Sequence, residues 1–158
     1  MEVRNGVFYG VGVGPGDPEL LTLKALRTLE RCPVIAAPRT RSGEMLALDI
    51  VHQAMSLEGK TILPLNFTMS RDPAVLRASH LRASEDIAAH LSAGRDVAML
   101  NLGDVSIYAT FGYLMDILTG SGYEAVMVPG VPSFCAVAAR LGVSLTTASS
   151  PLHILPAS

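Results

Sequence analysis

The chain has 158 residues, of which 49% are hydrophobic, and this is enough apolar material for one sizeable core. The 12 Lys and Arg residues and the 14 Asp and Glu residues give a net charge of -2, and neither sign gathers into a long run. The composition therefore indicates one compact domain and argues against a surface for nucleic acid or anionic membrane.

The first predicted unit is a strand, a glycine-rich loop and a helix. Residues 7–13 form an apolar run rich in β-branched and aromatic side chains, which indicates a buried strand. Asp17 is placed to cap the helix that follows, and Pro18 suits its first turn because proline lacks the N–H that has no partner there. Apolar residues then recur at helical spacing, at Leu21, Ala25 and Leu29.

The same alternation of strand and helix continues to Gly142. Further strands are predicted at 33–37, 61–65, 96–102 and 124–130. Further helices are predicted at 44–56, at 73–93, in a segment that runs through Leu118, and at 133–142. Strands that alternate with helices through short connections predict an α/β fold, with a mostly parallel sheet and helices on both of its faces.

The end of the chain is predicted to belong to a second unit. Residues 1–150 form the predicted domain, and the apolar stretch at 151–157 has the character of a strand with no successor. We therefore expect residues 151–158 to begin a truncated carboxy-terminal domain. No stretch is long and apolar enough to predict a membrane span, and the residues after Met1 do not form an export signal.

Three loops follow predicted strands, where ligands collect in open parallel sheets. The first, at 10–18, contains four glycines, but it fails the dinucleotide pattern because Pro15 and Asp17 stand where glycine is required. It also lacks the GK[ST] end of a phosphate-binding P-loop. This loop alone is as well explained by a tight turn from strand to helix as by a ligand site.

The second and third loops contain polar side chains beside glycine or proline. In the loop at 101–110, Asp104 is placed either to accept hydrogen bonds from a ligand or to cap the next helix. In the loop at 128–134, prolines stiffen the turn and Ser133 is placed to cap the helix that follows. A purely structural role remains open for both loops.

Other kinds of reactive site are not indicated. The histidines, at 52, 80, 90 and 153, lack the spacing of a metal site, so we expect no metal. The chain shows no GxSxG elbow, and we predict no catalytic nucleophile. Cys32 and Cys135 have no regular spacing, and we expect them to be reduced thiols of a cytoplasmic protein.

Taken together, three ordered motifs resemble the tetrapyrrole methylase family of S-adenosylmethionine-dependent methyltransferases. They are GVGPGDPELLTLKAL, NLGDVSIYATFGYL and VPGVPSFCAVAARLG, and the resemblance covers nearly the whole chain. The second motif, with LNFTMSRDPAVLRASH before it, is most similar to precorrin-2 or cobalt-factor-II carbon-20 methyltransferases of cobalamin synthesis. Val105 departs from the pattern, because many relatives have proline directly after the Gly-Asp pair. The resemblance implies that this chain is the amino-terminal of two α/β domains, with the cofactor in the cleft between them.

The resemblance also implies a site. By similarity, S-adenosylmethionine is expected against Pro15, Leu102, Gly103, Asp104, Ile107, Pro132 and Ser133. The tetrapyrrole is expected against Gly14, Gly16, Asp17 and Tyr108. Tyr108 and Tyr113 have two open readings, substrate contact or helix packing. Two interpretations are also open for Arg39 and Arg41, which could pair with substrate carboxylates or lie on a solvated surface.

The implied reaction is methyl transfer from S-adenosylmethionine to a ring carbon, with carbon 20 of precorrin-2 or cobalt-factor II as the expected acceptor. Alignment and desolvation of two bound molecules would then provide most of the catalysis. Other acceptors remain open, such as uroporphyrinogen or a modified histidine of an elongation factor, whereas the weakly basic composition argues against ribosomal RNA. A non-catalytic nucleotide-binding module and an interaction domain are also open. We expect a homodimer because the loss of a partner domain would expose apolar surface.

Overall fold

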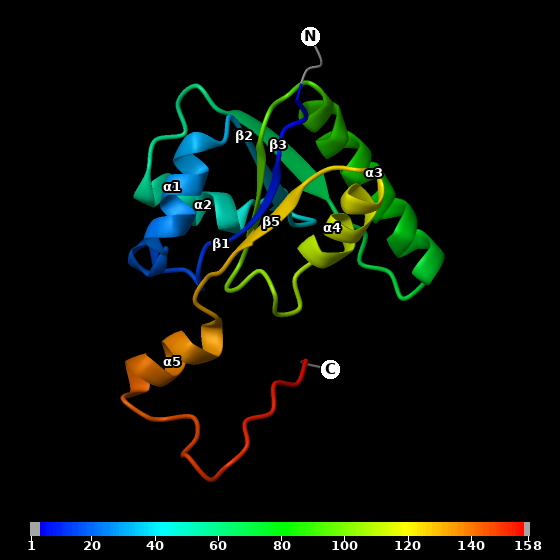
Figure 1. Ribbon diagram of the computed structural model, residues 1–158. Helices are drawn as coiled ribbons and strands as arrows, with labels where there is room; N and C mark the ends of the chain where they lie inside the picture. Colours follow the sequence, from blue (N-terminus) through cyan, green and yellow to red (C-terminus); the bar gives the residue numbers. More distant parts are fainter. Residues whose placement is uncertain (1–3, 157–158) are drawn as a thin grey trace.

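The computed structural model describes residues 4–156 and contains a parallel sheet flanked by helices (Figure 1). The strands are β1 (Phe8–Gly12), β2 (Val34–Arg39), β3 (Thr61–Asn66), β4 (Val97–Asn101) and β5 (Ala125–Val128). The α-helices are α1 (Leu23–Arg31), α2 (Leu46–Ala54), α3 (Pro73–Ser92), α4 (Phe111–Gly120) and α5 (Ser133–Leu141). The strand order is β3-β2-β4-β1-β5, and every strand pair is parallel. The predicted fold class is therefore confirmed.

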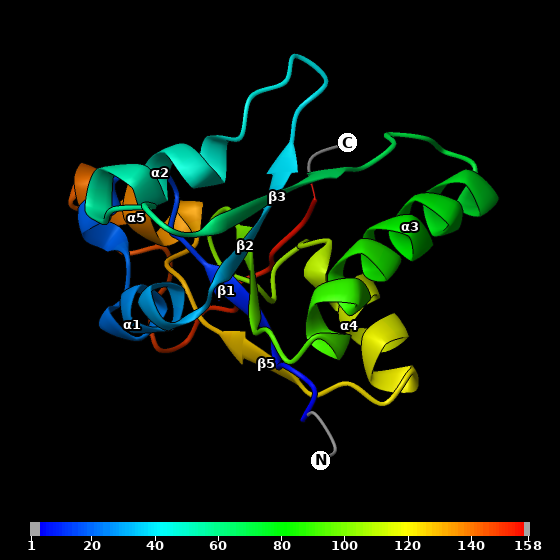
Figure 2. The same ribbon diagram turned by 90° about the horizontal axis from the view of Figure 1, so that it is seen from above.

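Helices cover both faces of the sheet, with α1 and α2 on one face and α3 and α4 on the other (Figure 2). Side chains of β2 alternate between these two layers. Val34 and Ala36 pack with α3 and α4, whereas Ile35 and Ala37 pack with α1 and α2. Because both faces are covered, the central strands consist of consecutive apolar residues, which is typical of parallel sheets.

The connections around β4 leave the sheet in opposite directions. The chain passes from β4 into α4 on one face, whereas the two neighbouring strands, β1 and β2, lead to α1 and α2 on the other face. Connections that diverge in this way leave crevices beyond the carboxyl ends of the strands, where ligands bind in open α/β sheets. This topology places candidate sites on both sides of β4.

Gly10 allows an aromatic pair to lie across β1. The rings of Phe8 and Phe111 have centroids 4.8 Å apart, and both side chains are fully buried. A Cβ atom on Gly10 would lie 2.6 Å from ring atoms of Phe111, closer than carbon atoms pack. One of the four glycines of the loop at 10–18 therefore serves the packing of the core.

The caps of two predicted helices differ from expectation. Asp17 accepts a hydrogen bond from the Glu19 backbone N–H, but it caps a single 3₁₀ turn, η1 (Pro18–Leu20), and not α1. The α1 helix begins later, and the side chain of Thr22 accepts a hydrogen bond from the Ala25 N–H at 3.0 Å. Ser133 is the first residue of α5 and its hydroxyl makes no capping bond. Gly142 does end α5, in the left-handed conformation that favours glycine.

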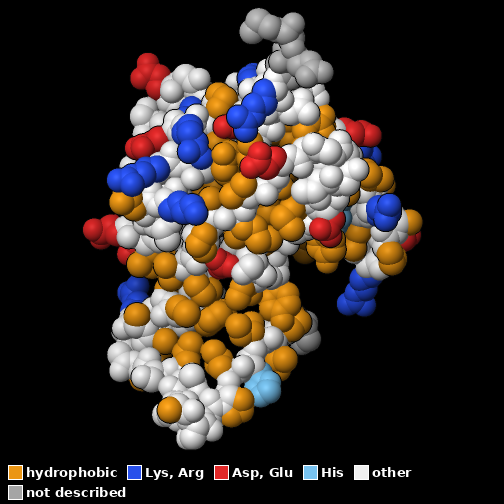
Figure 3. All heavy atoms as spheres, in the orientation of Figure 1, with side chains coloured by type: hydrophobic (Ala, Val, Ile, Leu, Met, Phe, Trp, Pro, Cys, Tyr) orange, Lys and Arg blue, Asp and Glu red, His pale blue; other side chains and the backbone are white. Residues whose placement is uncertain are grey.

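The carboxy-terminal part of the described chain stands away from the sheet. In Figure 1, α5 and the segment after it lie below the carboxyl ends of the strands, and only Ala138 of α5 is buried. The predicted strand at 151–157 is wrong for residues 151–156, which form no regular secondary structure; residue 157 lies outside the described residues. Figure 3 shows apolar atoms gathered around a hollow between this segment and the body. Within residues 4–156, no helix combines the length and apolar character needed to cross a membrane.

Gly10→Ala is expected to lower the free energy of unfolding by about 1–3 kcal/mol, because the added methyl group overpacks the core against Phe111. Gly112→Ala is the matched control, since a Cβ atom there meets nothing within 4 Å. Gly112 lies in α4, and alanine favours the helical conformation more than glycine does. Gly112→Ala should therefore raise the free energy of unfolding by about 0.5–1 kcal/mol. Urea unfolding measures both values, and equal stabilities for the two variants would contradict this account of Gly10.

Candidate functional site

Three loops that are far apart in the sequence meet beyond the carboxyl ends of β1, β4 and β5. Gly14 and Gly103 form an isolated antiparallel bridge, in which the Gly103 N–H donates to the Gly14 carbonyl at 2.8 Å. A Cβ atom on Gly12 would lie 2.6 Å from the Gly130 nitrogen and 2.7 Å from the Gly103 carbonyl oxygen. Here the bare backbone of the glycines is used for contact between the loops themselves.

Asp104 joins two of these loops. Its Oδ1 accepts a hydrogen bond from the Gly130 backbone N–H at 2.8 Å, and its Oδ2 accepts from the Ser106 backbone N–H at 2.9 Å and from the Ser106 hydroxyl. Asp104 is not a helix cap, because α4 begins only at Phe111. Partial burial raises the pKa of Asp104, but these hydrogen bonds outweigh burial and hold its pKa below the ordinary value.

A pocket of ≈ 260 Å³ lies between the second and third loops, and we call it the loop pocket. The second loop lines it with Leu102, Gly103, Asp104, Ile107 and Tyr108, and the start of α5 adds Pro132, Ser133 and Phe134. Six of the seven residues predicted to contact the cofactor therefore come together in one place. Residues 154–156 close the far side of the pocket.

The glycine loop is placed differently from the expectation. Pro15, the seventh predicted cofactor residue, does not line the loop pocket, and neither do the predicted substrate residues Gly14, Gly16 and Asp17. Gly14 is buried in the junction of the loops, and Asp17 caps η1. Among the predicted substrate residues, Tyr108 lines the pocket.

Tyr108 has an unusual backbone and a long-range contact. It is the non-glycine residue with positive φ (49°) among those described, and such a conformation costs energy for a bulky side chain. Its hydroxyl donates a hydrogen bond to the Ile154 carbonyl at 3.0 Å, which ties the second loop to the segment after α5. Neither this contact nor the position of Phe134 in the pocket lining was predicted from the sequence, because both depend on how α5 and the segment after it fold back.

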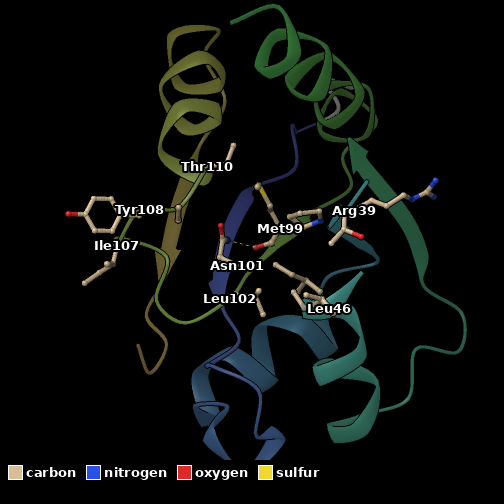
Figure 4. Close-up of a pocket in the computed structure, with 13 residues that line it drawn as sticks. Arg39, Leu46, Met99, Asn101, Leu102, Ile107, Tyr108 and Thr110 are labelled. Atoms are coloured by element: carbon tan, nitrogen blue, oxygen red, sulfur yellow. Dashed lines mark hydrogen bonds between the residues drawn. The ribbon is translucent and has the colours of Figure 1, made fainter. Parts of the chain in front are cut away.

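A second pocket, of ≈ 270 Å³, lies between the carboxyl ends of β2 and β4, and we call it the central pocket (Figure 4). Its apolar lining includes Pro38, Leu46 and Met99. It shares Leu102, Ile107 and Tyr108 with the loop pocket, so the second loop forms a wall of both. Buried Asn101 donates a hydrogen bond from Nδ2 to the Met99 carbonyl at 3.0 Å, which is drawn in Figure 4.

The chemistry of these pockets is suited to binding and orientation. Asp104 is the acidic residue in the lining of the loop pocket, and its low pKa keeps it ionised and unsuited to donate a proton near neutral pH. Within residues 4–156, no cluster of three His, Cys, Asp or Glu side chains is arranged to hold a metal ion. Tyr113 stacks on His80 with ring centroids 4.8 Å apart, as expected for helix packing.

Comparison with known proteins identifies the family. Residues 7–158 match the Tetrapyrrole (Corrin/Porphyrin) Methylases, and this match spans nearly the whole chain. The chain belongs to the tetrapyrrole methylase family. The pocket between the second and third sequence motifs is therefore the candidate cofactor site of a tetrapyrrole methylase fold.

Individual relatives share about a third of their residues with this chain. It is 33% identical over 152 residues to the cobalt-precorrin-2 C(20)-methyltransferase of Salmonella typhimurium, covering 96% of this chain and 63% of that protein. It is 35% identical over 158 residues to the cobalamin biosynthesis protein CobIJ of Mycobacterium tuberculosis, covering 96% of this chain and 31% of that protein. The chain therefore spans less than two thirds of the length of either relative.

A solved structure with a similar fold contains a product of the cofactor. The uroporphyrin-III C-methyl transferase of Thermus thermophilus, complexed with S-adenyl homocysteine, is 28% identical and superposes with a TM-score of 0.63. The superposition covers 91% of this chain and 51% of that one.

Asp104→Ala is expected to lower the free energy of unfolding by about 1–3 kcal/mol at pH 7, because the half-buried Gly130 N–H loses its hydrogen bond to an ionised carboxylate. Since the folded-state pKa lies below the ordinary 3.8, the contribution of Asp104 is fully present above that value. It should be lost as the pH falls through the lower folded-state pKa. Urea unfolding from pH 7 down to pH 3 measures the difference between variant and parent.

Asp116→Ala provides the control for this pH series, because Asp116 is an exposed residue of α4. Its effect on stability should be small, because the side chain is exposed. A difference for Asp104→Ala that stays the same at every pH would show that the carboxylate does not join the loops as its contacts indicate.

Proposed function

We propose that this chain carries the S-adenosylmethionine site of a methyltransferase in cobalamin biosynthesis, with carbon 20 of precorrin-2 or cobalt-factor II as the acceptor. The main support is that six residues predicted from the family motifs line one pocket, although they come from two loops far apart in the sequence. Family membership supports the reaction class, and the similarity to the Salmonella typhimurium enzyme supports the acceptor.

The residues of the loop pocket fit such a cofactor. Leu102, Ile107 and Phe134 offer apolar surface for a purine or a thioether. An ionised carboxylate has about four acceptor positions, and hydrogen bonds from Gly130 and Ser106 already use most of those of Asp104. Asp104 therefore has room for about one further donor, such as a ribose hydroxyl or an ammonium group.

S-adenosylmethionine, held by the residues that line the loop pocket, would supply an activated methyl group to the ring carbon. S-adenosylhomocysteine would leave with the electron pair of the broken S–C bond, and the proton displaced from the ring carbon would pass to bulk solvent. The residues of this chain have the task of holding two molecules in line and excluding water. The second loop is well placed for this, because it forms a wall of both the loop pocket and the central pocket. We propose no catalytic residue on this chain.

We further propose that residues 1–150 correspond to the amino-terminal domain of such an enzyme and that residues 151–158 begin the next domain. The Salmonella typhimurium protein is longer than the matched region, which covers 63% of it, and this leaves room for a second domain in such an enzyme. The contact between Tyr108 and Ile154 would then lie where the two domains join. Homodimer formation and a cytoplasmic location stay predictions.

Calorimetric titration is expected to show saturable binding of S-adenosylhomocysteine, and NAD should not bind. Ser133→Tyr should weaken binding at least about ten-fold, because Ser133 lines the loop pocket and a phenol ring there would occupy space that the ligand needs. Ser133 makes no capping bond, so its replacement should leave the fold intact.

Ser144→Tyr is the matched control, since Ser144 is exposed after α5 and does not line the loop pocket. It should bind S-adenosylhomocysteine as the parent does. An unchanged affinity of Ser133→Tyr for S-adenosylhomocysteine would contradict the proposed position of the site. Preferential binding of NAD would contradict the proposed cofactor and would favour a nucleotide-binding module.

The acceptor is tested separately by incubating the chain with S-adenosylmethionine and either precorrin-2, cobalt-factor II or uroporphyrinogen III. We expect precorrin-2 or cobalt-factor II to gain one methyl group, and NMR should locate this group at carbon 20. Faster methylation of uroporphyrinogen III would contradict the proposed acceptor.

A further inference from the structure

Two arginines border a third hollow at the same edge of the sheet. The hollow has a volume of ≈ 350 Å³ and lies where β2 and β3 end, and we call it the basic pocket. Its lining consists of Arg39, Thr40, Arg41, Ser42, Gly43, Asn66 and Phe67. Both arginines are exposed, and Figure 4 shows the Arg39 side chain extending outward from the rim of the central pocket.

The loop that carries Arg41 has a defined shape. The Thr40 N–H donates to the Glu44 carbonyl at 2.8 Å, and the Glu44 N–H donates to the Thr40 hydroxyl at 3.0 Å. The acidic side chain of Glu44 accepts a hydrogen bond from the Ser42 hydroxyl at 2.9 Å and is not part of the pocket lining. The chain therefore presents positive charge to this hollow.

Arg41 is held in place and still has donors to offer. Its Nη2 donates to the Met69 carbonyl at 3.3 Å, which connects the loop after β2 to the segment after β3. A guanidinium group has five N–H donors in a rigid plane, a geometry that matches a carboxylate. A single bond to a carbonyl oxygen leaves most of these donors for a ligand.

The three hollows adjoin one another along the carboxyl edge of the sheet. The basic pocket shares Arg39 and Thr40 with the central pocket. The central pocket in turn shares Leu102, Ile107 and Tyr108 with the loop pocket. An apolar floor is thus bordered on one side by the candidate cofactor site and on the other by two guanidinium groups.

We propose that Arg39 and Arg41 bind carboxylate groups on the rim of an anionic macrocycle whose ring lies over the central pocket. This inference rests on the proposed function, and it gives the arginines a role in positioning the acceptor. A flat apolar ring with acetate and propionate side chains requires both kinds of surface, and the carboxylates can form charge-assisted pairs with arginine. Anchoring the rim at β2 and β3 directs the opposite edge of the ring towards the loop pocket.

Uroporphyrin III is a suitable probe, because it is a stable macrocycle with acetate and propionate side chains. Its binding to the full 158-residue chain is followed by fluorescence. Arg39→Gln and Arg41→Gln should each weaken binding about three- to ten-fold, and the double variant should weaken it more than about ten-fold. The octamethyl ester, which lacks carboxylates, should bind the parent and the double variant equally. Added salt should weaken binding of the acid but not of the ester.

Arg27→Gln is the matched control, because it removes the same charge from an exposed position of α1 that lines none of the three pockets. It should bind uroporphyrin III as the parent does, and thermal unfolding should show that all variants are folded. Unchanged affinity in the double variant, or an equal loss in Arg27→Gln, would overturn the proposal.

Calorimetry with S-adenosylhomocysteine separates this inference from the proposed function. We expect the double variant to keep the affinity of the parent for S-adenosylhomocysteine, because Arg39 and Arg41 do not line the loop pocket. Binding of S-adenosylhomocysteine without any binding of uroporphyrin III to the parent would overturn the arginine proposal alone. Failure of both ligands to bind would overturn the two proposals together.

Discussion

The close approach of three backbones beyond β1, β4 and β5 is the constraint on which the site depends. Because β1 lies between β4 and β5, the loops that leave these strands must pass one another within a small space. Side chains at Gly12 or Gly130 would collide with neighbouring backbone, so glycine is required at the crossing. The hydrogen bond from the Gly130 N–H to Asp104 then fixes the second loop against the third. The walls of the loop pocket take their relative positions from this junction.

The position of β4 explains why several hollows adjoin. Its connection to α4 leaves on one face, while those of β1 and β2 leave on the other, so space remains on both sides of its carboxyl end. The loop after β4 must therefore form a wall on each side. Tyr108 lies in this loop with a positive φ, and its bond to Ile154 helps to hold that conformation. A change of shape in this loop would alter both pockets together.

Local signals in the sequence predicted the fold well, whereas contacts between distant segments could not be predicted. Apolar runs and glycine stops located the strands and helices, because burial on both faces of a parallel sheet leaves a clear pattern. The cap of α1 was assigned to Asp17 instead of Thr22, since a 3₁₀ turn intervenes and both residues suit a cap. The partner of Asp104 lies 26 residues away, and only the folded sheet brings the two together. An extended apolar stretch at 151–156 suggested a strand, but these residues pair with none of the five strands of the sheet.

The residues whose motifs resemble the family and the residues proposed to bind the acceptor line different hollows at the carboxyl edge of the sheet. The second and third motifs line the loop pocket, where the acceptor positions of Asp104 are largely used within the protein, so recognition of a cofactor there depends mainly on the shape of the apolar walls. The far side of the central pocket and the basic pocket are built instead from the end of β2 and the loop that follows it, outside all three motifs. On our proposal, the residues that meet the rim of the ring are therefore different from those that line the loop pocket. Under this proposal, Arg39 and Arg41 would contribute to the choice of acceptor from the end of β2 and the loop after it, at positions that do not line the loop pocket.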